Sequence, residues 1–169
     1  MPKVILIGPP GSGKSSVAKS LAKLLGTTHS DTDHLIEQRT EKKISEIFIE
    51  DGESKFREIE AEVVTLALAS ETGVLSLGGG AILNAITQQE LRANNALIVF
   101  LDVSISQAAP RVGFNKDRPL LLINPRQQWL ALMEKRRPIY ESLAGLFVST
   151  DNKKAIEVSY EIKALLAAR

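Results

Sequence analysis

Hydrophobic positions in the first part of the chain change from a short unbroken run to a helical spacing. Val4–Ile7 is apolar throughout and stops at Gly8, which predicts a buried strand that leads into a turn. Apolar residues then recur at helical spacing within Lys14–Leu25, and Gly26 stands where a left-handed helix cap is common. The pattern therefore predicts a strand, a glycine-rich turn and a helix, in that order.

Strand-like and helix-like patterns alternate along the rest of the chain. After Gly52 we expect a long helix with one apolar stripe, which ends at Glu71–Gly73. The residues of this stripe are Phe56, Ile59, Val63 and Leu66. The further predicted elements are a strand at Val74–Leu77, a helical segment containing Leu83, Ile86 and Leu91, a strand at Ala96–Leu101, a helix around Trp129 and a weaker strand at Phe147–Ser149.

This alternation defines the expected architecture. Neighbouring parallel strands need crossover connections, so the pattern predicts an α/β fold in three layers, α/β/α, around a central parallel sheet of five strands. Glycine, proline and charged residues gather at about 113–125 between two helical patterns, and we expect a mobile lid there. No repeat or linker divides the sequence, which predicts one domain over residues 1–169.

Composition narrows the class of protein. The 169 residues are 44% hydrophobic and 24% charged, as in ordinary globular proteins, and they include no cysteine, which excludes disulfides and thiolate metal sites. No apolar run is long enough to span a bilayer, and the opening residues lack the layout of a signal peptide, so we expect a cytoplasmic protein without a membrane partner. A net charge of +1 favours no general affinity for nucleic acid.

Charge is nevertheless distributed unevenly along the chain. Residues 28–62 contain 11 acidic and 5 basic side chains, whereas residues 104–137 contain 2 acidic and 7 basic ones. The second stretch can bind anions, although a solvated basic helix face would have the same composition.

The turn after the first predicted strand carries a phosphate-binding pattern. Gly8–Ser15 reads GPPGSGKS, two glycines spaced by four residues and followed by lysine and serine. Glycines let main-chain N–H groups and a helix N-terminus converge on phosphate, Lys14 adds a positive charge, and the Ser15 hydroxyl suits a magnesium ion between the phosphates. A turn that only starts a helix would need neither side chain. The pattern predicts a P-loop NTPase fold that binds ATP through Gly11, Ser12, Gly13, Lys14, Ser15 and Ser16.

Two carboxylates follow the expected second strand, in Asp31-Thr32-Asp33. In an extended chain, residues two apart face the same way, so both carboxylates could face the crevice above the sheet while Thr32 points elsewhere. Asp31 would then lie near the metal, and Asp33 would accept the proton or hydrogen bond of an attacking hydroxyl. An alternative of equal weight is that Asp33 only caps a helical stretch at residues 34–40.

With these residues assembled, the chain resembles the shikimate kinases, a family with the nucleoside monophosphate kinase-like fold. The resemblance rests on five ordered features: the phosphate loop, Asp31-Thr32-Asp33, Phe56-Arg57 with Glu60, Gly78-Gly79-Gly80, and Arg118-Pro119-Leu120-Leu121 followed by Lys135-Arg136 and Tyr140. It implies a kinase that transfers the γ-phosphoryl group of ATP to the 3-hydroxyl of shikimate, with Mg²⁺ as cofactor and the protein as a monomer.

The resemblance and the chemistry of shikimate together assign the acceptor site. Arg57 and Arg136 would hold the carboxylate of the substrate, because an arginine fork can bind a carboxylate through two parallel hydrogen bonds. Asp33 would hold the hydroxyl end, and Glu60, one helical turn beyond Arg57, would brace that arginine. The glycines 78–80 would line the ring with main-chain atoms, although a flexible turn would look the same in sequence.

The remaining assignments concern the nucleotide. Arg118, in the expected lid, would bring its charge to the transferring phosphoryl group, which makes Asp33, Lys14 and Arg118 the predicted catalytic residues. Arg111 resembles the family arginine that covers the adenine face, with plain surface exposure as the alternative. Ser15 and Asp31 are the predicted magnesium ligands.

Several other residues are expected to have no catalytic role. We expect Trp129, Leu132 and Met133 in the core and Arg137 on the surface, and His29 and His34 lack metal-ligand spacing.

Two places depart from common patterns. Ser76 stands where many phosphate-loop proteins have a magnesium-binding aspartate, and the segment at residues 150–152 lacks the proline usual for the family.

Other functions remain open at this point. A guanine-specific GTPase is disfavoured because residues 115–118 read NKDR, with the aspartate one residue too early for guanine recognition. The alternatives are a P-loop kinase for gluconate or a nucleoside monophosphate, and a non-catalytic nucleotide-binding module. The other P-loop kinases are disfavoured by Arg57, Arg136 and the three glycines. Measuring which acceptor makes the protein release ADP would distinguish a shikimate kinase, another kinase and a non-catalytic module.

Overall fold

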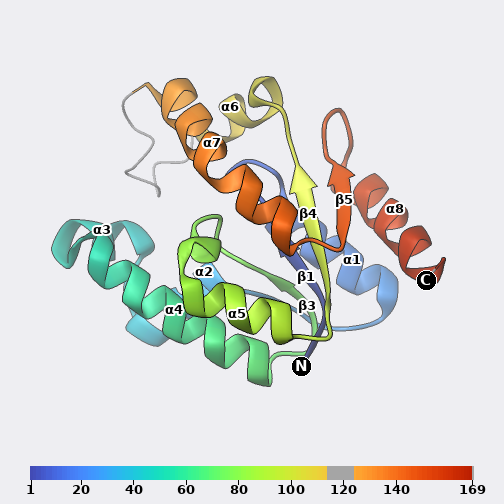
Figure 1. Ribbon diagram of the computed structural model, residues 1–169, viewed down its shortest axis with the longest axis horizontal. Coiled ribbons are helices and arrows are strands. Elements are labelled where there is room, and N and C mark those ends of the chain that lie inside the picture. The colour runs from blue at the N-terminus through green and yellow to red at the C-terminus, as the bar shows by residue number, and fades with distance from the viewer. Residues whose placement is uncertain (114–123, 169) are drawn as a thin grey trace.

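The computed structural model describes residues 1–113 and 124–168, and its centre is a sheet of five parallel strands (Figure 1). The order of the strands across the sheet is β2-β3-β1-β4-β5. Their bounds are β1 Pro2–Ile7, β2 His29–Asp31, β3 Gly73–Ser76, β4 Leu97–Asp102 and β5 Leu146–Ser149. The predicted five-stranded parallel sheet is confirmed.

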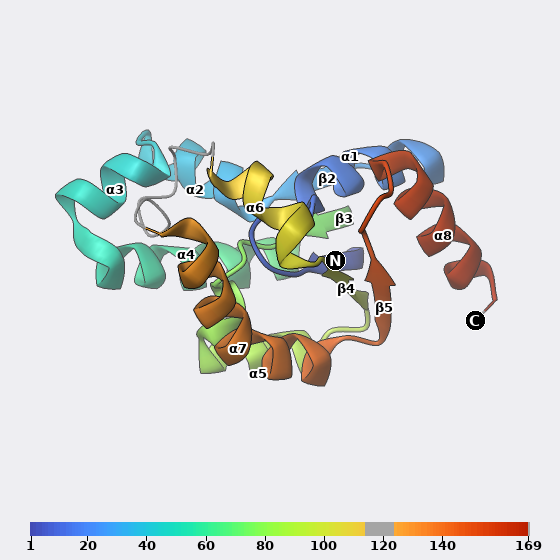
Figure 2. The same ribbon diagram turned by 90° about the horizontal axis from the view of Figure 1, so that it is seen from above.

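Helices cover both faces of this sheet, and the alternation of side chains along β1 shows why. Val4 and Leu6 pack on α1 and α8, whereas Ile5 and Ile7 pack in a cluster with α4, α5 and α7 (Figure 2). The helices are α1 Lys14–Leu25, α2 Thr32–Thr40, α3 Ile44–Glu50, α4 Gly52–Ser70, α5 Ala85–Ala93, α6 Ile105–Gly113, α7 Pro125–Leu143 and α8 Ala155–Ala167, with a short 3₁₀ helix η1 at Ala81–Leu83. The three-layer α/β/α arrangement is therefore confirmed.

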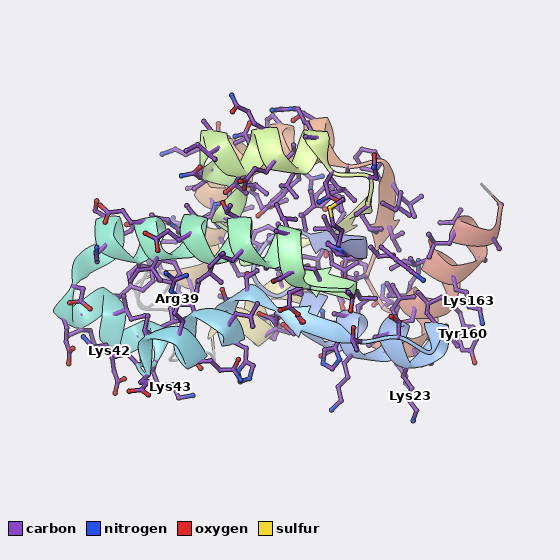
Figure 3. The ribbon with its side chains drawn as sticks, turned by 90° about the horizontal axis from the view of Figure 1, so that it is seen from below. Lys23, Arg39, Lys42, Lys43, Tyr160 and Lys163 are labelled. Carbon is purple, nitrogen blue, oxygen red and sulfur yellow. The ribbon has the colours of Figure 1, made fainter. Side chains whose placement is uncertain are left out.

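A smaller apolar cluster joins α2, α3 and α4 beside the sheet. It contains Ile36, Ile47, Phe56 and Val63, all of them buried. Its outer surface carries cations that pair with the acidic residues of the same segment, as Arg39 does with Glu62, and Figure 3 labels Arg39, Lys42 and Lys43 on this part of the molecule. Part of the negative charge of the acid-rich stretch is therefore paired locally.

The turn from β1 into α1 requires glycine. Gly8 has φ 152°, and a Cβ there would lie 2.6 Å from the main-chain oxygen of Leu101. The N-cap residue Gly13 has φ 84°, in the left-handed region that glycine favours. Helix α1 has the predicted bounds, and Gly26 ends it with φ 64° as expected.

Two predicted helical stripes are partly wrong. Leu66 of α4 is 55% exposed, because the buried face of this helix runs instead through the positions Phe56, Glu60, Val63, Val64, Ala67 and Leu68. Leu83 and Ile86 are also exposed, since Leu83 belongs to η1 and α5 starts only after Asn84, whose side chain accepts hydrogen bonds from Ile86 N and Thr87 N. Leu91 is buried as predicted.

The carboxyl ends of the five parallel strands lie at one edge of the sheet, where ligands of α/β proteins bind. The predicted lid falls mostly on residues 114–123, which lie outside the described residues; Gly113 ends α6 and Pro125 begins α7. Within the described part of the chain, no helix is both long and apolar enough to cross a membrane.

Candidate active site

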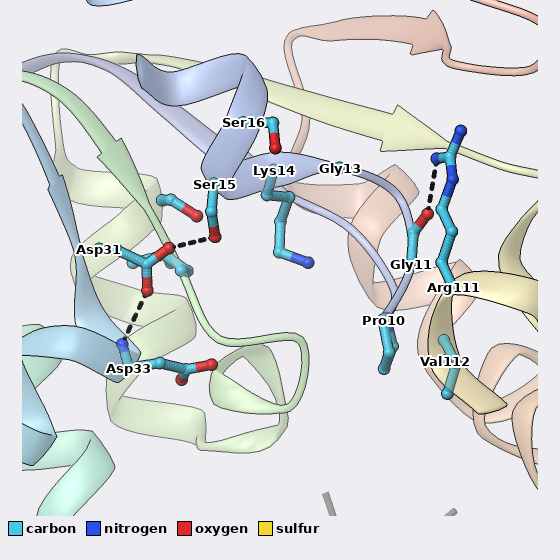
Figure 4. A pocket seen from close by; sticks show the side chains of 12 residues that line it. Pro10, Gly11, Gly13, Lys14, Ser15, Ser16, Asp31, Asp33, Arg111 and Val112 are labelled. Carbon is cyan, nitrogen blue, oxygen red and sulfur yellow. Dashed lines mark hydrogen bonds between the residues drawn. The ribbon is translucent and has the colours of Figure 1, made fainter. Parts of the chain in front are cut away.

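The phosphate loop surrounds the amino group of Lys14. This side chain comes from the first turn of α1 (Figure 4) and is 7% exposed. Its Nζ donates hydrogen bonds to Gly8 O at 2.9 Å and to Pro9 O at 3.1 Å. The N-terminus of α1 opens at the same place. Main-chain donors, a helix dipole and a lysine ammonium therefore converge where the phosphates of a nucleotide would bind.

Ser15 and Asp31 approach each other across the loop. Ser15 Oγ donates a hydrogen bond to Asp31 Oδ2 at 2.5 Å, which joins the start of α1 to the end of β2 (Figure 4). Both residues line a cavity of about 260 Å³. Its other lining residues are Pro10, Gly11, Gly13, Lys14, Ser16, Asp33, Ser76, Leu77, Arg111 and Val112. The cavity thus brings together Arg111 and five of the six phosphate-loop residues predicted to bind ATP.

The two carboxylates share this cavity, but not for the reason predicted. Asp31 is the N-cap of α2 and its Oδ1 accepts a hydrogen bond from Asp33 N at 3.0 Å, so Asp33 lies in the first helical turn and not in an extended chain. The capping role therefore belongs to Asp31. A β-strand residue followed by a helical turn still directs both side chains into the crevice.

Thr32 does point elsewhere, toward the glycine run. Its hydroxyl is completely buried and accepts a hydrogen bond from Gly78 N at 2.9 Å. This bond attaches the Asp31–Asp33 segment to the loop after β3. Sequence reasoning assigned no role to Thr32, and no local pattern could reveal a partner 46 positions away.

A buried ionic cluster lies next to Asp33. Arg57 Nη1 donates to Glu60 Oε2 at 2.5 Å, so the predicted brace is present, and the Glu60 side chain is only 4% exposed. Burial raises the pKa of Glu60, Arg57 opposes this rise, and the charge of Asp33 adds to it. Burial likewise lowers the pKa of Arg136, with Tyr140 and Glu60 acting in the opposite direction. Arg136 is thus a desolvated cation, which gains from an anionic ligand.

The three glycines fit closely against this cluster. A Cβ on Gly78 would lie 2.7 Å from both Asp33 Oδ1 and Glu60 Oε1, and one on Gly80 would overlap the guanidinium of Arg57. At Gly79 the nearest atoms are 3.3 Å away, a milder conflict. A side chain at Gly78 or Gly80 would therefore have to displace the charged groups of Asp33, Glu60 or Arg57, a constraint that a merely flexible turn would not have.

Helix α7 connects both loops. Trp129 Nε1 donates to Pro10 O at 2.8 Å, and Tyr140 OH donates to Gly79 O at 2.6 Å, with both side chains buried. Trp129 and Met133 lie in the core as expected. Arg137 lies at the surface as expected, with its side chain 40% exposed, and it makes a two-pronged ion pair with Asp102 at the end of β4.

A second cavity, of about 440 Å³, opens on the other side of the phosphate loop. Arg111 lines it together with Thr150, Lys153 and Lys154, and Arg111 Nη1 donates to Gly11 O at 3.0 Å. The turn at 150–154 is fixed to the start of α6 because Asp151 Oδ1 accepts from Ser104 N. This cavity is placed to hold the base of a nucleotide whose phosphates enter the loop.

The predicted lid arginine and the predicted magnesium site are the two remaining assignments. Arg118 falls outside the described residues. Among the residues that the structure does describe, no group of three or more histidine, cysteine or acidic side chains is arranged to hold a metal ion.

The fold and the site together define a P-loop phosphotransferase that acts on a small anionic acceptor. The shikimate kinase family model matches residues 10–167. The shikimate kinase of Thermobifida fusca (strain YX) is 49% identical over 99% of this chain and 96% of that protein, and that of Salinispora arenicola (strain CNS-205) is 46% identical over 99% of both. The chain belongs to the shikimate kinase family.

Solved structures agree with this assignment. Shikimate kinase from Acinetobacter baumannii, in complex with shikimate, is 34% identical, with a TM-score of 0.95 over 99% of this chain and 94% of that one. A gluconokinase from Sinorhizobium meliloti 1021 is 23% identical, with a TM-score of 0.65 over 98% of this chain and 91% of that one. The second likeness concerns the fold alone.

Proposed function

We propose that this protein transfers the γ-phosphoryl group of ATP to the 3-hydroxyl of shikimate, giving shikimate 3-phosphate and ADP. One observation carries the proposal: a phosphate loop and a charged cluster of Asp33, Arg57 and the buried Arg136 meet at the same edge of the sheet. Family membership supports the same reaction, which belongs to the biosynthesis of aromatic amino acids.

On the donor side, the proposal assigns the phosphates to the loop and the base to the cavity beside Arg111. Lys14 would exchange its bonds to loop carbonyls for phosphate oxygens and neutralise charge during transfer. Arg118 would add a second positive charge. Arg111 would lie against the base while its contact with Gly11 O holds it beside the loop.

Magnesium suits the oxygen atoms next to the loop. Ser15 Oγ and Asp31 Oδ2, 2.5 Å apart, are hard donors of the kind that Mg²⁺ prefers, and we propose that these two residues hold the ion together with the phosphates. Bound there, Mg²⁺ would neutralise negative charge on the phosphoryl oxygens.

On the acceptor side, the proposal places the carboxylate of shikimate against Arg57 and Arg136. Burial makes Arg136 a strong partner for an anion, and Glu60 fixes the rotamer of Arg57. The hydroxyl end of the ring would then meet Asp33, which holds or accepts the proton of the attacking hydroxyl. Gly78–Gly80 leave room for the ring, because side chains at Gly78 and Gly80 would occupy the space beside Asp33, Glu60 and Arg57.

Acceptor selectivity tests the proposal against its rivals. ADP release should be measured with shikimate, gluconate and AMP side by side, and we expect turnover with shikimate alone. Asp33→Asn should mainly lower kcat, whereas Arg136→Ala should mainly raise KM for shikimate. Arg126→Ala, an exposed arginine of the same helix, is the matched control and should change neither value. Turnover of gluconate or AMP in preference to shikimate, or unchanged kinetics in both site variants, would refute the assignment.

We further propose that the enzyme works as a cytoplasmic monomer with ATP and shikimate as its ligands and without nucleic acid or membrane partners. The near-neutral net charge supports the absence of a nucleic-acid partner. Light scattering at micromolar concentration, with and without both substrates, should give the mass of one chain.

A further inference from the structure

Arg137 follows Arg136 directly on α7, and the proposed reaction assigns it no role. Its guanidinium makes a two-pronged ion pair with Asp102, with Nη2 donating to Oδ1 at 2.8 Å and Nη1 to Oδ2 at 3.0 Å. The same guanidinium lies 5.7 Å from the centroid of the Phe100 ring. An arginine fork that binds both oxygens of one carboxylate is held in one orientation, unlike the single contact of an ordinary surface pair. The ion pair therefore attaches α7 to the end of β4 in a defined geometry.

The carboxylate of this ion pair is itself fixed to its surroundings. Asp102 Oδ1 also accepts a hydrogen bond from Val103 N at 2.9 Å. The main-chain oxygen of Asp102 accepts from Thr150 N at 2.8 Å and from Thr150 Oγ1 at 3.1 Å, and Thr150 is buried. Asp102 is thus a firm attachment point on the sheet for the guanidinium of α7.

Two hydrogen bonds also attach α7 to the loops of the site, but they lie on another side of the helix. Trp129 donates to the phosphate loop and Tyr140 to the glycine run, and the two are about three whole turns apart, so both project in nearly the same direction. Arg136 projects within roughly 20° of Trp129, whereas Arg137 projects roughly 80° away from it. Bonds along one line leave a helix free to roll about that line. An attachment to one side, at Arg137, resists such a rotation.

The side of α7 that carries Arg137 is incompletely packed. A cavity of about 460 Å³ lies between α7 and the start of α6, and Arg137 lines it together with Trp129 and Met133. Pro138 stands inside the helix at the same turn, and it has no N–H to donate to Glu134 O. Apolar packing and main-chain hydrogen bonds are therefore both weaker here, which leaves the ion pair to hold this turn in place.

We propose that the ion pair between Arg137 and Asp102 positions Arg136 for the carboxylate of the acceptor. Because the two arginines are adjacent on one helix, a rotation of α7 that separates Arg137 from Asp102 would also swing the buried guanidinium of Arg136. The inference rests on the proposed function and deepens it: acceptor affinity depends on an ion pair that acts through another residue. Arg137 and Asp102 are positioning residues.

The affinity for shikimate, measured by calorimetry without nucleotide, tests the inference. We expect the Kd for shikimate to rise about tenfold in Arg137→Ala, while the Kd for ADP changes less than about twofold. Asp102→Asn should have a smaller effect on shikimate, because the amide oxygen can still accept from Val103 N but binds a guanidinium more weakly. Arg137→Lys, which keeps the charge without the fork, should restore part of the affinity. Circular dichroism checks that each variant is folded, and Asp102→Asn, the milder change, carries the test if Arg137→Ala does not fold.

A double variant shows whether the effect passes through Arg136. Arg136→Ala alone should weaken shikimate binding, and the addition of Arg137→Ala should weaken it no further, because the group to be positioned is gone. Glu141→Gln is the matched control, since Glu141 approaches the same arginine at 3.6 Å from an exposed position, and it should change neither Kd.

Three results would overturn the inference: an unchanged Kd for shikimate in Arg137→Ala and Asp102→Asn, an equal loss of ADP affinity, or a further loss of shikimate affinity in the double variant. The proposed reaction is judged separately, by turnover. A wild type that binds shikimate without phosphorylating it would refute that reaction, while the Kd values would still decide the role of the ion pair.

Discussion

Glu60→Gln separates the stability of the acceptor site from its function. Glu60 is almost fully buried and contacts Arg57 at 2.5 Å, yet burial still raises its pKa above the usual value. Desolvation of the ionised carboxylate therefore outweighs the attraction of Arg57. Because Arg57 is 26% exposed and keeps its contact with Glu53, a neutral glutamine of similar shape should leave the free energy of unfolding at neutral pH unchanged or higher. The same change weakens the brace, because a neutral acceptor bonds a guanidinium about half as strongly as a carboxylate does. A loss of about 1.4 kcal/mol in shikimate binding corresponds to an increase of about tenfold in KM.

The raised pKa of Glu60 also predicts the direction in which the free energy of unfolding changes with pH. A folded-state pKa above the unfolded value stabilises the protein most below the unfolded pKa, near 4.5, and this contribution is lost as pH rises through the folded pKa. The unfolding free energy of the wild type relative to Glu60→Gln should therefore fall as pH rises from about 4.5 through that value. Urea titrations across this range and shikimate kinetics at neutral pH measure both effects. Glu53→Gln is the control, because Glu53 contacts the same arginine at 3.6 Å from an exposed position. Marked destabilisation of Glu60→Gln at neutral pH with unchanged KM would refute the reasoning.

Two further substitutions test the packing around the site. Gly80→Ala should displace the Arg57 guanidinium and raise KM for shikimate at least about tenfold with ADP affinity unchanged, whereas Gly79→Ala should have the smaller effect; the reverse order would contradict the close packing. Tyr140→Phe removes the bond to Gly79 O and should lower the unfolding free energy in urea by about 1–2 kcal/mol, while Tyr160→Phe, on an exposed side chain of α8 (Figure 3), should change nothing; equal stability of the two variants would be the contrary result.

Features fixed by short-range chemistry could be predicted from the sequence. The bounds of α1 follow from Gly13 and Gly26, both in the left-handed region, and the phosphate loop follows from its own glycines and Lys14. The five parallel strands follow from apolar runs between helical patterns. Arg57 and Glu60 could also be paired in advance, because three helical positions separate them.

The sequence predictions failed where contacts between distant segments determine which residues are buried and where a helix begins. Leu66 fits the helical period of α4, but the neighbours of this helix bury the adjacent positions instead, including the polar Glu60. Asp33 was expected either in extended chain or as the cap of a helix at residues 34–40, yet Asp31 is the cap and α2 starts two residues earlier, at Thr32. Arg137 lies at the surface as expected, but its partner Asp102 could not be foreseen, because it is 35 positions away on β4. None of these outcomes has a signal in the local pattern.

The contacts that the sequence hides also explain how one helix can align two substrates. Trp129 and Tyr140 of α7 donate to main-chain oxygens, one in the phosphate loop and one in the glycine run, and Arg136 lies between them in the buried cluster. Every residue has a main-chain carbonyl, so the sequence of the two loops does not show that they accept these hydrogen bonds. Phosphoryl transfer depends on alignment of the attacking oxygen with the γ-phosphoryl group, and a misplacement of about 1 Å can cost a hundredfold in rate. Because one helix is attached to both loops and carries the arginine that we propose for the acceptor, we infer that α7 sets the separation between donor and acceptor.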